Sequence, residues 1–305
     1  MEVSIVLATY NSEKSKILES IASFIRQKDI KMEILIADDG STEFPRLEIE
    51  NFFLKKNFKN YQIIENVKNQ GTVKNMIGAA RKCQGKWILS FGPGDCIIGD
   101  DCIRKWIDYT ENRQVEISFS DILSYSRDEN GQPYPVSVKC APQMPNKIDN
   151  DDYEKVMYQY LINGDLICGV ALLTKTDIYL KYLEKIENIV IYAEDHLFRL
   201  MVLERNRIVY FPKQTILYEY GEGVSTSGKG EWPRLLTNDK CGVDTIIRNN
   251  STKKIKKYYE RITNKKYKKW MLYILYPRRF WYLICVKIKP RMSGIIDDSV
   301  LQKYI

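Results

Sequence analysis

The chain contains 305 residues, of which 44% are hydrophobic and 28% charged, so it is long enough for one large domain with a substantial core. Residues 251–291 hold fourteen of the 47 Lys and Arg residues but only one of the 39 acids, Glu260, which leaves 33 bases and 38 acids elsewhere. An acidic body with a basic tail excludes a uniformly basic nucleic-acid coat.

The cysteines and the apolar stretches indicate the cellular environment. Seven cysteines are scattered without a C-x-x-C pair, and the single histidine argues against a structural zinc site. The start of the chain lacks the basic region of a signal peptide. The longest apolar stretches, 270–276 and 280–286, have seven residues each, far below the roughly 20 that a spanning helix needs. We therefore expect a cytoplasmic protein with reduced thiols.

Strand and helix patterns alternate through the first hundred residues. Continuous apolar runs predict buried strands over 3–8, 34–37, 61–64 and 87–91. Apolar residues at helical spacing predict helices over 17–25, 43–56 and 73–83. Four β-α units in succession predict an α/β fold with a parallel, doubly wound sheet.

The second half of the chain has a different pattern. It predicts a hairpin or meander over 119–125 and 136–139, a helix over 151–162, a strand over 168–174 and an amphipathic helix over 193–205. Short strands over 208–211 and 215–220 precede a glycine-rich loop at 221–230. From residue 231 onward the chain is predicted to be helical, and from 251 it is basic and aromatic.

Polar residues cluster where the predicted strands end. These positions carry Thr9-Tyr10-Asn11, Asp38-Asp39-Gly40-Ser41 and Gly94-Asp95. Ligands of open α/β sheets bind beyond the carboxyl ends of the strands, so three such turns predict one site. Neither a G-x-G-x-x-G sequence nor a P-loop follows the first strand. Carboxylates and an aromatic ring, rather than a glycine cradle, would therefore hold the ligand.

Six motifs together resemble family 2 glycosyltransferases of the GT-A fold, of the kind that builds bacterial polysaccharides such as O-antigen or capsule. They read SIVLATYN at 4–11, IADDGST at 36–42, NQGTVKN at 69–75, SFGPGD at 90–95, AEDH at 193–196 and YEYGEGVST at 218–226. Their order matches that of the family, and together they span about residues 3–226. The resemblance implies a Rossmann-like, mostly parallel sheet flanked by helices.

The resemblance also implies a reaction, in which a hexosyltransferase moves a sugar from a nucleotide donor to an acceptor hydroxyl with inversion. Such a one-step displacement needs one general base, and Asp195 of the E-D pair corresponds to it. Glu194, beside it, corresponds to a donor-binding residue. On the residues alone, both acids could equally complement the dipole at a helix N-terminus.

A divalent metal, Mg²⁺ or Mn²⁺, is the implied cofactor, because a Lewis acid usually neutralises the leaving diphosphate. Asp95 corresponds to the last carboxylate of the family's D-x-D-type metal motif. The motif is degenerate here, because Gly92 and Gly94 stand where aspartates are common. One carboxylate supplies little of the oxygen shell of either ion. Asp95 could otherwise be a turn residue.

Four further residues correspond to the nucleotide site, with UDP as the expected nucleotide. Asp39 corresponds to the acid that accepts the uracil imide N–H, Tyr10 can stack on the base and Thr9 can hydrogen-bond the nucleoside. Lys74 and the backbone around Gly94 complete the donor site, although Lys74 could equally be a solvated helix charge. Ser225 and Thr226 end a loop that closes over the substrates in relatives.

The expected organisation is a catalytic domain over 1–230, with a nucleotide half up to about 100 and an acceptor half after it, followed by a helical basic extension over 231–305. The extension is expected to bind an anionic membrane surface, placing the protein at the inner face of the cytoplasmic membrane near a lipid-linked glycan acceptor. Packing on the catalytic domain or a homodimer contact is the alternative. An inactive nucleotide-sugar-binding homologue, a sugar nucleotidyltransferase and a nucleic-acid binder are the competing functions, and we expect no nucleic-acid partner.

Overall fold

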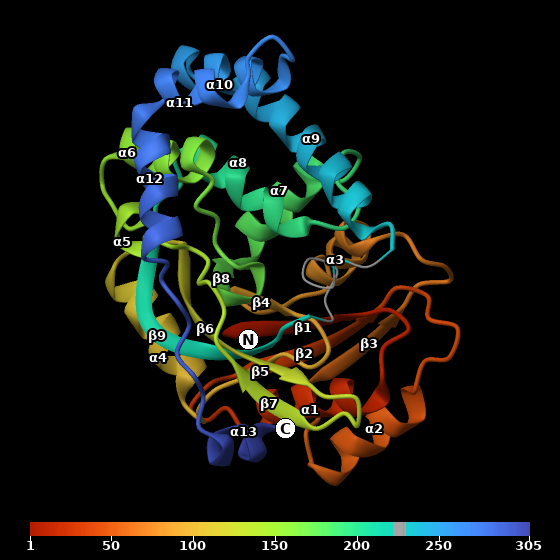
Figure 1. The fold of residues 1–305 in the computed structure, drawn as a ribbon. Helices are drawn as coiled ribbons and strands as arrows, with labels where there is room; N and C mark the ends of the chain where they lie inside the picture. The colour runs from red at the N-terminus through yellow and green to blue at the C-terminus, as the bar shows by residue number, and fades with distance from the viewer. Residues whose placement is uncertain (222–227, 229) are drawn as a thin grey trace.

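A computed structural model of the protein describes residues 1–221, 228 and 230–305. Across these residues nine strands form one mixed sheet in the order β3-β2-β1-β4-β8-β6-β9-β5, with β7 paired to β6 outside this path. Helices cover both faces of the sheet, and the C-terminal helices form an arch along one side (Figure 1). The protein is therefore an α/β protein, as its sequence predicts.

The strands are β1 Val3–Thr9, β2 Met32–Asp38, β3 Tyr61–Glu65, β4 Trp87–Phe91, β5 Cys96–Ile97, β6 Ile117–Arg127, β7 Pro133–Val136, β8 Leu172–Lys175 and β9 Ile208–Glu219. The helices of the first two hundred residues are α1 Lys14–Ile25, α2 Arg46–Lys55, α3 Thr72–Ala80, α4 Cys102–Asn112, α5 Pro145–Ile148, α6 Tyr153–Met157, η1 Tyr158–Asn163, η2 Gly169–Ala171, α7 Thr176–Ile186, η3 Glu194–His196 and α8 Leu197–Leu203. The last segment forms α9 Trp232–Asn250, α10 Lys253–Thr263, α11 Lys269–Leu275, α12 Pro277–Ile288 and α13 Asp298–Tyr304.

The first hundred residues fold as predicted, because their strands are buried on both faces and their helices carry one apolar side. The pairs β1–β2, β1–β4 and β2–β3 are parallel. Side chains of β1 alternate between two hydrophobic clusters, with Val6 in one and Ile5 and Leu7 in the other. The carboxyl ends of β1, β2 and β4 consequently meet at one edge of the sheet, which we call the rim.

Three predictions for the second half are corrected by the structure. The hairpin partner of β6 is 133–136 rather than 136–139. The predicted helix over 151–162 is the short α6 followed by a π-helical turn, η1. The strands predicted over 208–211 and 215–220 are one strand, β9, which pairs with β6 with register shifts around Asp121. Pro212 has no N–H to donate, and it lies among residues 211–213, which fall between the pairs Phe119–Tyr210 and Asp121–Gln214 without a partner of their own. The strand therefore continues across an irregularity at the place of the predicted break.

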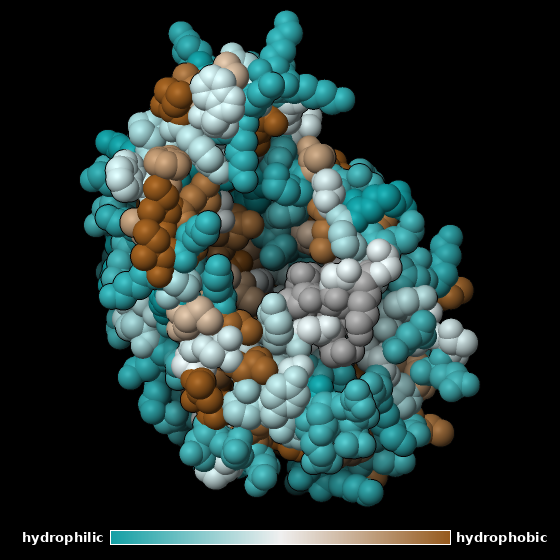
Figure 2. Space-filling view, viewed as in Figure 1, coloured by the Kyte–Doolittle hydropathy of each residue, from teal (hydrophilic) through white to brown (hydrophobic). Residues whose placement is uncertain are grey.

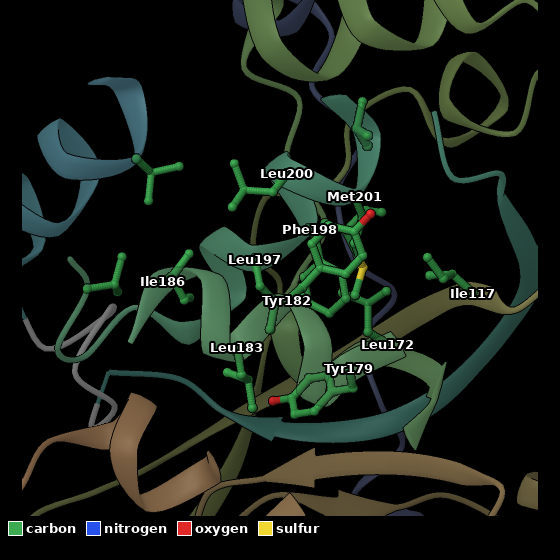
Figure 3. Packing of buried hydrophobic residues seen from close by; sticks show 14 of the residues in the cluster. Ile117, Leu172, Tyr179, Tyr182, Leu183, Ile186, Leu197, Phe198, Leu200 and Met201 are labelled. Atoms are coloured by element: carbon green, nitrogen blue, oxygen red, sulfur yellow. The ribbon is translucent and has the colours of Figure 1, made fainter. Parts of the chain in front are cut away.

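The larger of the two hydrophobic clusters lies between the sheet and the helices α3, α7, α8 and η1. Figure 3 shows side chains of α8, among them Leu197 and Phe198, facing Tyr182 and Leu183 of α7. The E-D pair, Glu194–Asp195, lies in η3, and α8 follows η3 without interruption. The packing of α8 therefore also holds the pair in place.

The basic extension packs on this body. Ile255, Tyr258 and Tyr259 of α10 are buried in the same cluster as α7 and α8. The Tyr259 hydroxyl donates to the Leu161 carbonyl at 2.9 Å. Leu301 and Tyr304 of α13 form a third cluster with residues of β5 and β6. The domain boundary at residue 230 stays a prediction, because α10 and α13 both share hydrophobic clusters with the body.

The helices of the extension are short, with seven to nineteen residues each. In the part of the chain that the structure describes, no helix combines the length and the apolar character needed to cross a bilayer.

Candidate active site

Asp39 lies at the end of β2 and fastens a loop of the rim. Its Oδ1 accepts from the Gln70 N–H at 2.9 Å and the Asn66 side chain at 3.1 Å, and its Oδ2 accepts from the Gly71 N–H at 2.8 Å. The side chain is buried. Because a carboxylate oxygen can accept two hydrogen bonds, Oδ2 keeps one position for a further donor.

The neighbouring residues of β1 and β2 shape the same corner. The Thr9 carbonyl accepts from the Asp39 N–H at 2.8 Å, and the buried Thr9 hydroxyl has no hydrogen-bond partner among the described residues. Tyr10 is 48% exposed at the rim, so its ring is available for stacking. Asp38 accepts from the Ser41 N–H at 2.8 Å and from the Ser41 hydroxyl, which gives it a structural role in the turn.

Asp95 holds the turn after β4 against the end of β9. Its two carboxylate oxygens accept from the Gly92 and Glu219 N–H groups, each at 3.2 Å. Burial raises the pKa of Asp95 to about 7, and the charge of Glu219 adds to the rise while the two N–H donors oppose it. An adjacent cation would favour the ionised form of this carboxyl.

Gly94 leaves space that another acid occupies. Its φ is +96°, which disfavours any side chain, and a Cβ built there would lie 2.0 Å from Oε2 of Glu219. The carboxylate of Glu219, from β9, therefore occupies the place that the Cβ of any other residue at position 94 would take. Glu219 is not among the site residues that the sequence predicts, although an acid directly after the apolar residues 216–218 was a signal for it.

Glu219 is almost completely buried and belongs to an ionic cluster with Lys16, Arg127 and Glu19. Its Oε1 lies 2.8 Å from Lys16 Nζ and 3.2 Å from Arg127 Nε, whereas Oε2 has no hydrogen-bond partner among the described residues. Arg127 also pairs with Glu19 at 2.5 Å. Two cations therefore neutralise Glu219 directly below the turn that carries Asp95.

The E-D pair lies in the short helix η3, partly buried between the rim and α9. Burial and the charge of Asp195 raise the pKa of Glu194 to about 8. Burial also raises the pKa of Asp195, but the charges of His196 and Arg199 oppose that rise. The charge of Arg199 thus favours the ionised form of Asp195, whereas for Glu194 the charge of Asp195 adds to the rise.

Contacts connect the E-D pair to both other parts of the site. The Val73 N–H, two residues beyond the Gly71 that Asp39 holds, donates to the Ile191 carbonyl at 3.0 Å. On the other side lies Cys168, near both Asp95 and Asp195. Burial raises the pKa of its thiol to about 12, and the charges of the two acids add to the rise. A Cβ at Gly169 would lie 3.0 Å from the Asp195 Cβ, so glycine allows the close approach.

Some predicted site residues are peripheral or cannot be placed. Lys74 is exposed in the first turn of α3. Ser225 and Thr226 lie outside the described residues. Within residues 1–221, 228 and 230–305, no three His, Cys, Asp or Glu side chains converge as metal ligands would. Asp95, with Glu219 beside it, fits a Mg²⁺-like ion that takes most of its oxygen ligands from a diphosphate and water.

The site thus combines Thr9, Tyr10 and Asp39 at the rim with a pair of carboxyls of raised pKa, and a family comparison supports the resemblance seen in the sequence. The family model "Glycosyl transferase family 2" matches residues 4–173, more than half of the chain. The chain belongs to glycosyl transferase family 2. As a family 2 glycosyltransferase, it is an enzyme of the transferase class, and its fold is the GT-A fold.

Two curated relatives are similar over most of the chain. A poly(ribitol-phosphate) beta-N-acetylglucosaminyltransferase, TarS, of Staphylococcus aureus is 26% identical over 235 residues, which cover 74% of this chain and 37% of TarS. An uncharacterized glycosyltransferase of Haemophilus influenzae is 24% identical over 86% of this chain and 73% of its own length. The chain thus spans little more than a third of the length of TarS.

Solved structures show the same fold. A crystal structure of residues 1–349 of S. aureus TarS in complex with UDP aligns with a TM-score of 0.55 at 19% identity, covering 82% of this chain and 65% of that chain. The mannosyltransferase PcManGT of Pyrobaculum calidifontis, in complex with GDP-Man and Mn²⁺, aligns with a TM-score of 0.51 at 12% identity, covering 94% and 86%.

Proposed function

We propose that this family 2 glycosyltransferase moves a sugar, with inversion, from a UDP donor to an acceptor hydroxyl, and that Asp195 is the general base. The observation that carries the proposal is the pair Glu194–Asp195, whose pKa values burial raises while only Asp195 has cationic neighbours. A carboxylate with a raised pKa is a stronger base, which suits removal of a proton from a hydroxyl group.

In the proposed reaction Asp195 takes the proton of the acceptor hydroxyl as its oxygen attacks the anomeric carbon of the donor. The new glycosidic bond forms on one face of the sugar while the bond to the diphosphate breaks on the other. UDP leaves with the electron pair of the broken bond. Glu194, protonated near neutral pH, can donate a hydrogen bond to the donor sugar.

For the nucleotide, we propose that the free acceptor position of Asp39 Oδ2 takes the imide N–H of uracil, and that Tyr10 stacks on the base. Thr9 has a buried hydroxyl without a partner among the described residues, which suits a bond to the nucleoside. Lys74 is exposed and free to face the phosphates. Because a relative is named as a beta-N-acetylglucosaminyltransferase, UDP-N-acetylglucosamine is the first donor to test.

We also propose a divalent metal cofactor, Mg²⁺ or Mn²⁺, held by Asp95 and the diphosphate. The raised pKa of Asp95 supports this, because a cation would stabilise its ionised form. When bound, such an ion supplies Lewis-acid neutralisation of the departing diphosphate. EDTA is expected to abolish most turnover, and full activity in EDTA would remove the metal from the proposal.

The proposed acceptor is a lipid-linked glycan of bacterial surface polysaccharide synthesis, reached at the inner face of the cytoplasmic membrane through α11 and α12. Four large hydrophobic side chains there are 59–78% exposed: Trp270, Ile274, Trp281 and Ile288. Hydrophobic side chains gather over these helices in Figure 2. Lys and Arg residues surround them, a combination that suits an anionic bilayer.

A donor screen tests the enzymatic proposal. The full chain is incubated with UDP-N-acetylglucosamine and other UDP and GDP sugars in Mg²⁺ or Mn²⁺, and thermal stabilisation and donor hydrolysis are measured. We expect stabilisation by UDP sugars and slow release of UDP from one of them. Binding without any turnover would instead favour an inactive nucleotide-sugar-binding protein, and preference for a guanine nucleotide would contradict the assignment to UDP.

A vesicle experiment tests the membrane surface. The full chain should sediment with vesicles containing phosphatidylglycerol and be released by high salt, whereas Trp270→Ser with Trp281→Ser should stay in solution. Leu54→Ser is the matched control, because Leu54 of α2 is 77% exposed but lies far from α11. Equal sedimentation of all three proteins would refute the membrane role, and a dimer lost only in the tryptophan variant would assign the surface to a second copy.

A further inference from the structure

The first helix of the C-terminal extension lies along the segment that leads into the E-D pair. Three contacts follow one another along α9. The Trp232 ring packs edge-on against Tyr192 at 5.0 Å, Asp239 binds residues 191–193, and Gly242 lies so close to Ile189 that a Cβ there would be 2.5 Å from Ile189 Cγ2. Two residues further along, Asp244 pairs with the buried Arg199 of α8.

Asp239 is the centre of this contact. Its Oδ1 accepts from the Ile191 N–H at 3.0 Å, and its Oδ2 accepts from the Tyr192 N–H at 2.8 Å and the Ala193 N–H at 3.0 Å. The side chain is only 3% exposed. A buried carboxylate that accepts from three successive N–H groups holds those three peptide groups in one arrangement.

The N–H groups of the segment that Asp239 holds have their partners outside the segment. Residues 191–193 form neither helix nor strand, so these N–H groups depend on a distant acceptor, and Asp239 provides it. The Ile191 carbonyl accepts from Val73 on the nucleotide side, and Asp239 binds the N–H groups on the opposite side. Glu194 and Asp195 follow immediately, so the place of the pair depends on where Asp239 holds the preceding peptides.

We propose that Asp239 is a positioning residue for catalysis, which sets the location of the Asp195 carboxylate relative to the acceptor hydroxyl. The extension would then be part of the catalytic machinery as well as a surface for partners. This inference rests on the proposed role of Asp195 as base. Because a displacement of about 1 Å at a reacting group can cost on the order of 100-fold in rate, loss of Asp239 should reduce kcat while leaving donor affinity unchanged.

The test compares Asp239 with Glu33, another buried carboxylate with three donors. Glu33 lies near the start of β2, at the edge of the sheet opposite the rim, and accepts from Ser4, Gln62 and the Gln84 N–H. Asp239→Asn keeps one acceptor oxygen and the shape of the side chain, so it should fold even if Asp239→Ala does not. Glu33→Gln is its matched control.

Three quantities are measured for the full chain: kcat, the Kd for UDP, and the hydrogen-exchange rates of the amides of residues 191–193. We expect Asp239→Asn to lower kcat about 10-fold and Asp239→Ala about 100-fold, with Kd within about threefold of the parent and faster exchange at 191–193. Glu33→Gln should lower the melting temperature without changing kcat or these amides.

The outcomes separate the two claims. Unchanged exchange at 191–193 in both Asp239 variants, or faster exchange with an unchanged kcat, would overturn the positioning role. A kcat loss in Glu33→Gln equal to that in Asp239→Asn would also overturn it, since general destabilisation would then explain both. If instead the parent shows no transfer and no donor hydrolysis, the proposed function fails, and the exchange result still reports on the contact itself.

Discussion

Asp39 lies at the rim, directly after β2, whereas Asp195 lies in the short helix η3, and the protein holds the two acids by different means. Asp39 accepts hydrogen bonds from Asn66, Gln70 and Gly71, so its own carboxylate is part of the structure. Burial and neighbouring charges instead set the pKa of the Asp195 carboxyl. The hydrogen bonds next to Asp195 are made by the peptide groups before it, which donate to Asp239.

The difference has a functional consequence. A carboxylate that accepts from three N–H donors has a fixed orientation, which suits recognition of a nucleotide base. A carboxyl with a raised pKa is a better proton acceptor and must move little while it takes up a proton. Substitutions on the two sides should therefore affect different measured quantities, binding on the Asp39 side and turnover on the Asp195 side.

The largest effect is expected for Asp195→Asn. The amide has nearly the same shape but cannot take the proton of the acceptor hydroxyl, so kcat should fall by about 10²–10⁴-fold. The Kd for UDP, measured by calorimetry, should stay within about threefold of the parent. Retention of a third or more of the parental kcat would assign the role of base to another residue.

Asp39→Ala should act on binding. Loss of the charged acceptor is expected to weaken UDP binding by about 1–3 kcal/mol, since the imide N–H would lose its partner. UDP methylated at the imide nitrogen provides the control. The parent should bind it poorly and the variant should bind both nucleotides alike, so a parent that does not distinguish the two would contradict contact with the imide.

Glu194→Gln tests the raised pKa through stability. An unfolded Glu ionises with its ordinary pKa near 4.5, whereas folding raises the pKa of Glu194 to about 8, so the folded state binds the extra proton between these values. Stability from this group is therefore fully present at low pH and is lost as the pH rises toward 8.

The variant, which cannot ionise, should be more stable than the parent at pH 8 by up to about 4 kcal/mol, which is several degrees in melting temperature. At pH 5 the two proteins should melt alike. A variant that is less stable than the parent at pH 8 would show that Glu194 is ionised in the folded protein.

The smallest effect is expected where the extension meets the core. Tyr259→Phe removes the hydroxyl that donates to the Leu161 carbonyl and accepts from Arg199 at 3.1 Å, which should cost about 1–2 kcal/mol in the free energy of unfolding by urea. Tyr134→Phe, at an exposed position of β7, should leave the free energy of unfolding unchanged within error. Equal stability of both variants would mean that α10 contributes no specific hydrogen bonds to the catalytic body.

Much of the first half of the protein was predictable from local patterns. The strands over 3–8 and 34–37 are continuous apolar runs, and such runs become buried strands regardless of their distant partners. The polar turns after them had to share an edge, because parallel strands place their carboxyl ends together. The motifs around Asp39, Asp95 and Asp195 could therefore be located before any contact was known.

Other features required tertiary structure, because their cause lies far away in the sequence. Pairing with β6 on both sides of Pro212 joins two predicted strands into β9, with a shift of register at the proline itself. Glu219 reaches Gly94 only because β9 pairs antiparallel with β5. The side chains of Asp239, Val243 and Ile247 recur on one buried face of α9, which indicated burial but no partner.

The sequence alone determined that this chain is an α/β protein with acids at its strand ends. The periodicity of apolar residues and the succession of strands and helices along the chain are local properties. Tertiary structure decided which distant acid fills the space left by Gly94 and which helix holds the peptides before Glu194. Both depend on contacts between segments separated by more than forty residues, where no short-range pattern in the chain specifies the partner.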